Sequence, residues 1–311
     1  MTGAWPELSA ARDRPTIVAL HLFAQVLGKV PTAVLPWRNH GWHLTLHVTP
    51  RGLATEPVYA PAGVFTLALD LAEHQFVYED AARRMTVSLG PATVAAFHGQ
   101  VMNILARAGH DLRISGAPNE VEPATPFAED HAPRAYDRDS AARLLGALQN
   151  ADRVFRLFRS SFLGKASPVQ FFWGSFDLAV TRFSGRTAPR HPGGIPNLPD
   201  DVTREAYSHE ESSAGFWPGG AGAEGGPFFY AYAYPTPAGF ADADVRPEAA
   251  RWDAALGEYV LDYDAVRRAP DSDAALLSFL SSTYEAAADL GKWDRAALEC
   301  ATGRAGVPRQ V

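Results

Sequence analysis

Asp177 is the first residue whose type and setting suggest chemistry. It lies in FFWGSFDLAVTRFSGR, residues 171–186, an apolar stretch with the alternation of a β-strand. An ionised carboxylate costs several kcal/mol to bury unless it is paired, so Asp177 needs a partner, water or a ligand. Trp173 and Ser175 share its predicted face and are candidate ligand contacts. A structural salt bridge would satisfy Asp177 equally well.

An imidazole stands next to a carboxylate at His209 and Glu210, within SHEESSAGFWPGG. Such a pair can act as acid or base near neutral pH. We predict a long loop over residues 187–226, and loops of that length inside a compact domain are usually functional or disordered. His209 and Glu210 would then lie on a rim over a pocket, with Trp217 in its wall. A solvated polar loop is the other interpretation.

More imidazoles occur in NHGWHLTLHVT, where alternation predicts a strand with His43 and His47 on one face. At about 3.3 Å per residue these side chains are about 13 Å apart, too far to share one metal ion. His43 is a candidate catalytic group, and a hydrogen-bonded histidine in a half-buried strand is the simpler interpretation. The sequence leaves any metal or cofactor open.

Aromatic and basic side chains could bind the ligand. Tyr230 and Tyr232 alternate with alanines in FFYAYAY, and a row of phenols suits a flat, partly polar molecule. The same row could simply complete a sheet. Arg182 and Arg186 could bind a carboxylate or phosphate, although surface arginines are common.

The elements that must position these residues alternate along the chain. We predict helices at residues 16–28, 94–105, 140–163 and 273–290, with a shorter one near the C-terminus, and strands at residues 42–49, 64–71, 75–78, 85–89, 111–114, 171–186, 228–234 and 257–263. This pattern predicts an α+β fold in which helices flank antiparallel sheets.

The chain divides into an N-terminal α+β half at residues 1–115, a connecting loop at 116–137 and a C-terminal α+β half at 138–311. Short matches between the halves, such as residues 27–29 with 163–165, suggest a duplicated unit with a pseudo-twofold axis. Equivalent strands could then bring His43 close to Asp177.

The composition limits the class of protein. The 311 residues are 47% hydrophobic and 20% charged, as in a globular protein, and the net charge is −7 with no Lys/Arg cluster for nucleic acid. We find no signal peptide and no apolar run near the length of a membrane span, which predicts a cytoplasmic protein without a membrane partner. One cysteine, Cys300, excludes an intramolecular disulfide. The oligomeric state stays open.

Several long segments together carry a family resemblance. They are HLFAQVLGKV, NHGWHLTLHVTPRGL, SPVQFFWGSFDLAVTRFSGR, EAYSHEESSAGFWPGG, FFYAYAYPTPAGF and LSFLSSTYEAAADLGKWDRAALE. The chain resembles, over nearly its whole length, a family of bacterial proteins catalogued as a domain of unknown function. The resemblance implies no activity.

Two classes of function fit these residues. The first is an enzyme on a small polar or anionic metabolite, with His43, Asp177, His209 and Glu210 as acid–base or metal-binding groups in an aromatic-walled pocket. The second is a protein that binds or senses a small ligand without turnover. The motifs of serine hydrolases, zincins and P-loop enzymes are not found. A scaffold would instead need a large exposed apolar patch.

Overall fold

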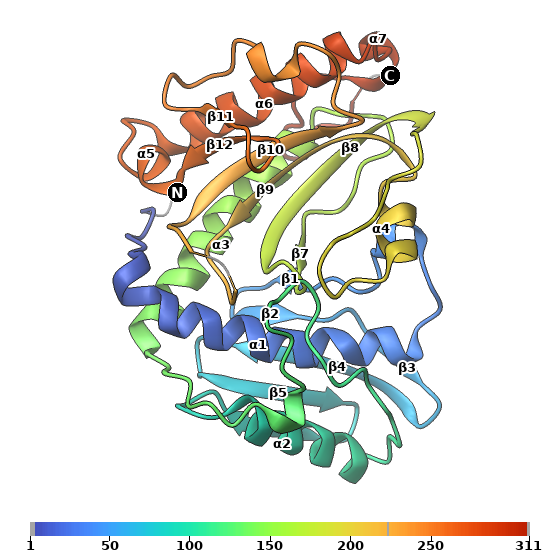
Figure 1. The fold of residues 1–311 in the computed structure, drawn as a ribbon, viewed down its shortest axis with the longest axis vertical. Helices are drawn as coiled ribbons and strands as arrows, with labels where there is room; N and C mark the ends of the chain where they lie inside the picture. The colour runs from blue at the N-terminus through green and yellow to red at the C-terminus, as the bar shows by residue number, and fades with distance from the viewer. Residues whose placement is uncertain (1–3, 223, 310–311) are drawn as a thin grey trace.

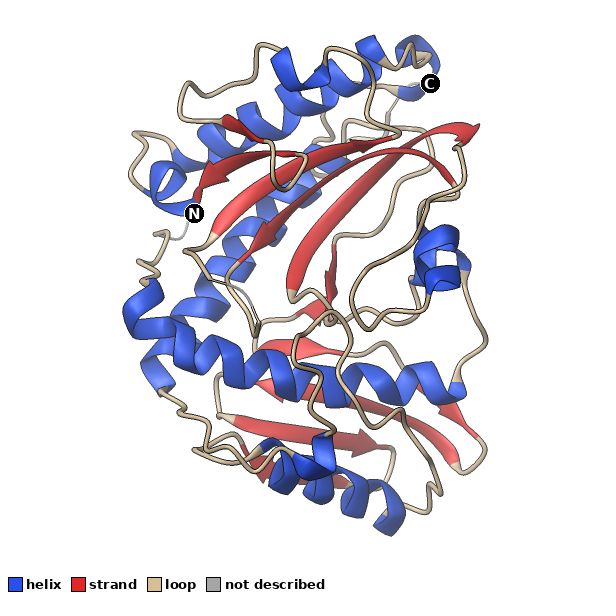
Figure 2. Ribbon diagram, in the orientation of Figure 1, coloured by secondary structure: helices blue, strands red, loops and turns tan. Residues whose placement is uncertain are grey.

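The computed structural model describes residues 4–222 and 224–309, and it shows two antiparallel sheets with helices packed on them (Figure 1). Helices and strands are mixed along the chain (Figure 2). The predicted α+β fold class is therefore confirmed.

The N-terminal sheet is an antiparallel arrangement in the order β1-β2-β4-β5-β6, with β3 paired to β4. Phe65, Leu67 and Leu69 of β4 are buried and alternate with more exposed residues, so one face of the sheet enters the core. The strands of this sheet are β1 (His47–Val48), β2 (Gly52–Ala54), β3 (Val58–Ala60), β4 (Gly63–Asp70), β5 (Gln75–Asp80) and β6 (Arg84–Ser88).

The C-terminal sheet has the order β11-β12-β10-β9-β8-β7. Leu178 and Val180 of β8 and Phe216 of β9 are buried on the face that packs against α3 and α6. The strands are β7 (Gln170–Phe172), β8 (Asp177–Thr187), β9 (His209–Trp217), β10 (Phe228–Tyr234), β11 (Arg251–Asp253) and β12 (Glu258–Asp262).

Four of the described helices begin at residues whose side chains accept a backbone N–H of the first turn: Thr93, Asp137, Asp271 and Asp294. The α-helices are α1 (Ala10–Val34), α2 (Val94–Arg107), α3 (Arg138–Arg159), α4 (Asp200–Ala206), α5 (Tyr263–Arg267), α6 (Ser272–Leu290) and α7 (Arg295–Leu298). Short 3-10 turns occur at η1 (Asn39–Gly41), η2 (Phe127–Glu129) and η3 (Phe240–Asp242).

The helix α1 crosses the middle of the molecule, with the C-terminal sheet above it and the N-terminal sheet below it in the view of Figure 1. It is longer than predicted, because Pro15 and Pro31 lie inside it. By length and hydropathy it could span a membrane, so the expectation that no apolar run reaches that length is wrong. However, 78% of its apolar window is buried against the rest of the protein, as in a core helix.

Four predicted elements differ from the structure. Residues 171–186 are not one strand, because Phe176 adopts a positive φ of 62° and turns β7 into β8. The expected loop at 187–226 contains α4 and the central strand β9. The expected strand at 42–49 begins with a turn that follows η1, and only His47–Val48 pairs as β1; residues 111–114 form no strand.

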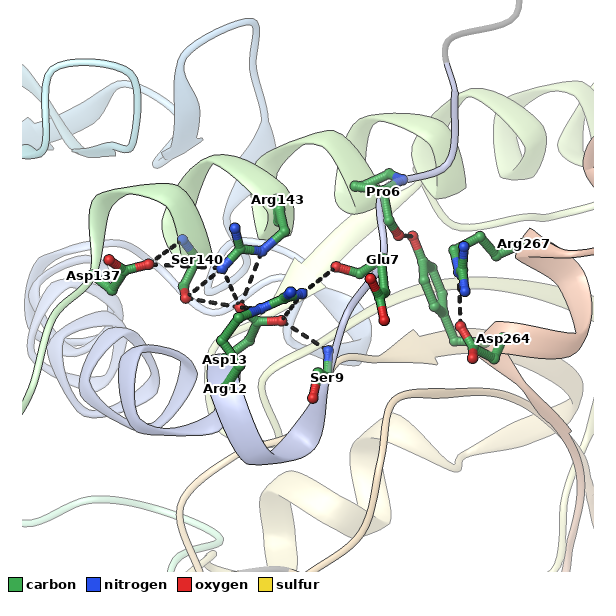
Figure 3. Close-up of polar contacts among 11 residues, drawn as sticks. Pro6, Glu7, Ser9, Arg12, Asp13, Asp137, Ser140, Arg143, Asp264 and Arg267 are labelled. Carbon is green, nitrogen blue, oxygen red and sulfur yellow. Dashed lines mark hydrogen bonds and ion pairs between the residues drawn. The ribbon is translucent and has the colours of Figure 1, made fainter.

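Polar contacts fix α1 to α3 (Figure 3). The buried carboxylate of Asp13 accepts hydrogen bonds from Ser140 and Arg143 of α3 and from the neighbouring Arg12. In the segment before α1, the Pro6 carbonyl accepts a hydrogen bond from the hydroxyl of Tyr263 at 2.7 Å. The N-terminal segment is therefore held by elements of the C-terminal half.

The two sheets meet where Leu46 and Phe171 exchange backbone hydrogen bonds of 2.8 and 2.7 Å. Each half runs helix, strands, helix, but the proposed internal repeat is not confirmed: residues 27–29 lie inside α1, whereas residues 163–165 follow the end of α3. The division at residues 115 and 138 stays a prediction.

Candidate functional site

The face of the C-terminal sheet turned away from α3 and α6 carries polar side chains, and we call it the polar face. Strand pairing places its members side by side, because residues in register point to the same side of a sheet. The polar face consists of Asp177 and Thr181 of β8, Glu211 and Ser213 of β9, Tyr230 and Tyr232 of β10, and Glu258 of β12.

Asp177 stands at the start of β8 and is only 5% exposed. Its two carboxylate oxygens accept hydrogen bonds from the hydroxyls of Ser175 and Tyr230. Burial raises the pKa of Asp177, and these two hydrogen bonds act in the opposite direction. The Tyr230 ring reaches Asp177 by lying across Gly215 of β9, where a Cβ atom would be 2.3 Å from the ring.

Glu211 lies on the same face and is also 5% exposed. The Tyr207 hydroxyl donates to Tyr232 at 3.1 Å, and Tyr232 faces a Glu211 oxygen at 3.5 Å. Burial raises the pKa of Glu211 to about 8, although Tyr232 and the charge of Lys165 act to lower it. At neutral pH this carboxyl group therefore holds a proton in most molecules.

Two further carboxyl groups approach Asp177. Burial raises the pKa of Glu258 to about 8 and that of Glu120 to about 7, and the charge of Asp177 adds to both shifts. The Glu120 carboxylate lies against Gly174, where a Cβ atom would be 2.2 Å from it, so a larger residue at position 174 would displace this carboxylate. We call Glu120, Asp177, Glu211 and Glu258 the carboxyl cluster.

Within residues 4–222 and 224–309, no Lys, Arg or His forms an ion pair with any member of the carboxyl cluster. Asp13 is a buried carboxylate that does have such ion-pair partners. It is fully buried, but hydrogen bonds from Arg12, Ser9, Arg143 and Ser140 hold its pKa below its ordinary value despite the cost of burial. The carboxyl cluster lacks such partners, although Asp177 and Glu211 are buried and Glu120 and Glu258 are partly buried.

The charge of Lys165 acts on Glu211, and its ammonium group lies over the rings of Trp42 and Phe183. Its Nζ is 2.5 Å from Nε2 of His40. Since His40 Nδ1 faces the Ala206 carbonyl at 2.8 Å and a carbonyl only accepts, Nδ1 carries the proton and Nε2 accepts from Lys165. Burial lowers the pKa values of both Lys165 and His40.

Two loops cover part of the polar face. The segment before α4 places the His191 ring on Tyr207, with ring centroids 4.6 Å apart. The segment around Glu120 is tied to it, because the Glu120 N–H donates to the Pro196 carbonyl at 3.1 Å. Tyr230, Tyr232, Glu258 and Glu120 nevertheless keep some exposure to solvent.

The structure places three candidates away from this face. Arg182 is 2% exposed on the opposite face, where its guanidinium lies 3.5 Å from the Phe158 ring centroid and packs in the core. Glu210 points away from Glu211, as adjacent strand residues must. It pairs with Arg186 at 2.5 Å, and Arg186 also donates to the Gly291 carbonyl at the end of α6.

The predicted histidines do not meet Asp177. His43 accepts the Arg38 N–H at 3.2 Å and packs edge-on against Trp37. His209 lies beside His40, with ring centroids 5.8 Å apart. Among the described residues neither imidazole hydrogen-bonds Asp177, so the expected convergence of His43, Asp177 and His209 is not observed.

The two candidate tryptophans, Trp173 and Trp217, pack against other parts of the protein. The Trp173 indole N–H donates to the Leu44 carbonyl at 2.5 Å, and its ring packs against Gly28 of α1. Trp217 ends β9 and packs on Phe228 with ring centroids 5.2 Å apart. Trp173 thus joins the halves, whereas Trp217 borders the polar face.

A cavity of about 720 Å³ lies elsewhere, between the start of α1 and residues 118–135. Alanine and proline line much of it, and two of its charged residues, Asp130 and Arg134, pair with each other at 2.5 Å. It contains none of the predicted site residues. We therefore place the candidate site at the polar face, where unpaired ionisable groups gather.

The fold and the polar face together define an α+β protein with a buried, tyrosine-rich carboxyl site. The chain belongs to the family of unknown function DUF5996, whose model matches residues 5–300. This agrees with the resemblance seen in the sequence. No curated protein and no solved structure gave a match to the chain.

Sequence reasoning missed Glu120, Glu211 and Glu258. For Glu211 a signal existed: in HEESSAGFW, residues 209, 211, 213, 215 and 217 alternate with Ala214 and Phe216, which are apolar. Reading this stretch as a strand would have placed Glu211 with Trp217 and Glu210 on the other face. Glu120 lies in an irregular loop, and no spacing indicates its contact with Gly174.

Proposed function

We propose that the protein is an enzyme that moves protons to and from a small molecule bound at the polar face. The observation that carries the proposal is the carboxyl cluster: two buried and two partly buried carboxyl groups gather with tyrosine hydroxyls and have no ion-pair partner in the described chain. Unpaired carboxyl groups destabilise a fold, and groups with raised pKa values in one place are typical of acid–base catalysis.

The surroundings of two carboxyl groups suggest their roles. Asp177 receives two hydroxyl hydrogen bonds, which favour its ionised form and suit a base. Glu211 has only a 3.5 Å contact with Tyr232 and a pKa of about 8, so it is protonated at neutral pH and suits an acid. Two carboxyl groups with different surroundings are a common basis for such a division.

Incubation of the purified protein with a mixture of metabolites, followed by mass spectrometry, tests the proposal. We expect a compound to be consumed by the wild type and by the control Asp262→Asn, whose carboxylate is exposed and paired with Arg251. Glu211→Gln and Asp177→Asn should slow its consumption by about 10²-fold or more, the usual contribution of a general acid or base. Full turnover by both variants would contradict the proposal.

A protein that binds the same molecule without changing it is the second candidate. It is favoured by the positions of His43 and His209, because neither imidazole contacts the carboxyl cluster. A compound that stabilises the wild type against heat, loses this effect in Glu211→Gln, and keeps its mass after incubation would support this candidate.

The remaining proposals concern the partner and the location of the protein. We propose a small molecule as the partner, with no nucleic acid and no membrane, and a cytoplasmic location. The net charge of −7 and the burial of α1 support these proposals.

A further inference from the structure

We propose that the ligand of the polar face is a small organic cation, carrying an ammonium or guanidinium group that the carboxyl cluster and the tyrosine hydroxyls bind. This inference rests on the proposed function, because it names the class of molecule on which the same site acts. The positive charge and the N–H donors of the ligand are specified, and the rest of its structure is not.

The first support is the mismatch between the carboxyl cluster and its counter-charges. Other buried carboxylates have their cations within the protein: Asp13 pairs with Arg143 at 2.6 Å, and Asp70 with Arg51 at 2.7 Å. Lys165 acts on Glu211, but it is held by His40 and two aromatic rings. If these carboxyl groups ionise, no described ion pair balances their charge, and a cationic ligand could supply the positive charge.

The second support is an unsatisfied amide on the same face of the sheet as Asp177. Gln170 is 1% exposed, and it pairs with Ala179 across β7 and β8, which puts its side chain on the same face as Asp177. One of its two amide atoms has no hydrogen-bond partner. A buried polar atom without a partner costs free energy, so a group supplied by a ligand is a reasonable partner.

The identity of this atom follows from Thr45. The Thr45 hydroxyl has one proton, yet it faces two acceptors, the Trp42 carbonyl at 3.2 Å and the Gln170 amide oxygen at 3.1 Å. Exchanging the amide N and O of Gln170 resolves this conflict, because the NH₂ then donates to Thr45 while Thr45 donates to Trp42. The unsatisfied atom is then an oxygen, which accepts hydrogen bonds from an ammonium or guanidinium group.

The tyrosine hydroxyls of the polar face also favour a cationic ligand. Tyr207 donates to Tyr232, Tyr232 faces Glu211, and Tyr230 donates to Asp177, so each hydroxyl proton is directed to an oxygen within the protein. What these groups offer a ligand is oxygen lone pairs and ring faces, and both attract cations.

An organic cation fits better than a metal ion. Within the described residues, no three His, Cys, Asp or Glu side chains converge closely enough to hold a metal. Tyrosine rings separate the carboxyl groups instead, with the Tyr230 and Tyr232 rings nearly parallel at 6.1 Å. Groups spread in this way match a molecule with several N–H donors more closely than a single ion.

Binding must be linked to proton release. The members of the carboxyl cluster are Asp177 of β8, Glu211 of β9, Glu258 of β12 and Glu120 of a covering segment. The other charged and titratable groups that face them are Tyr230 and Tyr232 of β10, Asp253 of β11, Tyr207 of the second covering segment and Lys165 before β7. Without a ligand, burial keeps protons on Glu211 and Glu258 at neutral pH. A bound cation favours their ionised forms, so its affinity should rise with pH until these groups ionise without it.

Calorimetric titration of the full chain tests the inference. The probes are methylammonium, guanidinium and 1,4-diaminobutane, with 1,4-butanediol as neutral analogue, butanoate as anion, and Mg²⁺ and Mn²⁺ as metals. We expect at least one organic cation to bind, with an affinity that rises by up to about tenfold per pH unit between about pH 6 and pH 8 for each proton released. Buffers with different ionisation enthalpies measure that release directly.

Isosteric variants identify the site. Glutamine reproduces the shape of a protonated carboxyl group, so Glu211→Gln and Glu258→Gln should keep the fold while weakening cation binding by about tenfold or more. The control Asp262→Asn lies on the same strand as Glu258 and should bind as the wild type does. Cation binding unchanged in both glutamine variants would overturn the inference.

The other outcomes are equally decisive. If no organic cation binds, or if the metals, the diol or butanoate bind instead, the inference is wrong; the proposed function still stands where the metabolite test finds a neutral or anionic compound consumed in a Glu211-dependent way. If a cation binds at the site and no compound is consumed, the inference stands and the proposed enzyme fails.

Discussion

Asp13 and Asp177 show how the surroundings of a buried carboxyl group decide its protonation. Both are nearly inaccessible to solvent. Two arginines lower the pKa of Asp13, whereas Asp177 has only hydroxyl partners and burial raises its pKa. The sequence indicated that Asp177 needed a partner, but the partner, Tyr230, is 53 residues away and only the strand pairing reveals it.

Stability should depend on the protons of Glu211 and Glu258. Their folded pKa values of about 8 lie above the unfolded value of about 4.3, so the folded state keeps protons that the unfolded state releases. This stabilisation is complete below about pH 4.3 and is lost as the pH rises toward 8. Glu211→Gln should therefore flatten the fall in unfolding free energy between about pH 5 and pH 8, by up to about 1.4 kcal/mol per pH unit.

Urea denaturation at several pH values measures this slope. The exposed control Asp262→Asn should reproduce the wild-type slope. If the unfolding free energy falls with pH equally steeply in the wild type and in Glu211→Gln, Glu211 is already ionised in the folded protein.

At the scale of elements, regular strands with a clear alternation were predictable. The strands β4, β5, β6, β10 and β12 and the helices α2, α3 and α6 lie within a few residues of their predicted positions. The strand β9 was missed because serines, glycine and two glutamates gave it the composition of a loop. Its polarity has a physical reason, since one side of β9 forms part of the polar face.

Gly215 of β9 should be essential for the position of Tyr230. A Cβ atom there would lie 2.3 Å from the Tyr230 ring, so Gly215→Ala must push the ring away from Asp177. We expect a loss of about 1–3 kcal/mol in unfolding free energy, as for other overpacked sites, together with weaker ligand binding. Thermal unfolding and titration with the cation probes measure the two effects.

Gly99→Ala provides the contrast for this experiment. Gly99 lies in α2, and a methyl group added there would enter open space, so alanine should stabilise the helix by up to about 1 kcal/mol. A Gly215→Ala protein as stable and active as Gly99→Ala would show that Tyr230 need not lie across β9.

At the scale of the whole molecule, α1 belongs to both halves. Its buried residues join one hydrophobic cluster that includes Phe97 of α2 and Leu144 of α3. Before α1, the Trp5 ring packs edge-on against Phe229 and Tyr263 of the C-terminal half. Such contacts between residues distant in the sequence carry no local signal, which is why the predicted division of the chain could not include them.

The C-terminal half should not fold by itself. A fragment of residues 138–311 lacks α1 and Trp5, and it would expose the side chains of α3 and the sheet that they cover. We expect this fragment to be insoluble or to lack a cooperative unfolding transition by circular dichroism. Expression together with residues 1–137 should restore both properties. A fragment 138–311 that unfolds cooperatively alone would instead support independent domains.

The unpaired state of the carboxyl cluster also has an evolutionary consequence. Mutation and drift tend to replace a group that weakens a fold unless selection for activity retains it. The Asp13–Arg143 pair fastens α1 to α3, and other combinations of side chains can do the same. Among distant members of the family, acids at positions 120, 177, 211 and 258 should therefore persist longer than the partners that merely fasten one helix to another.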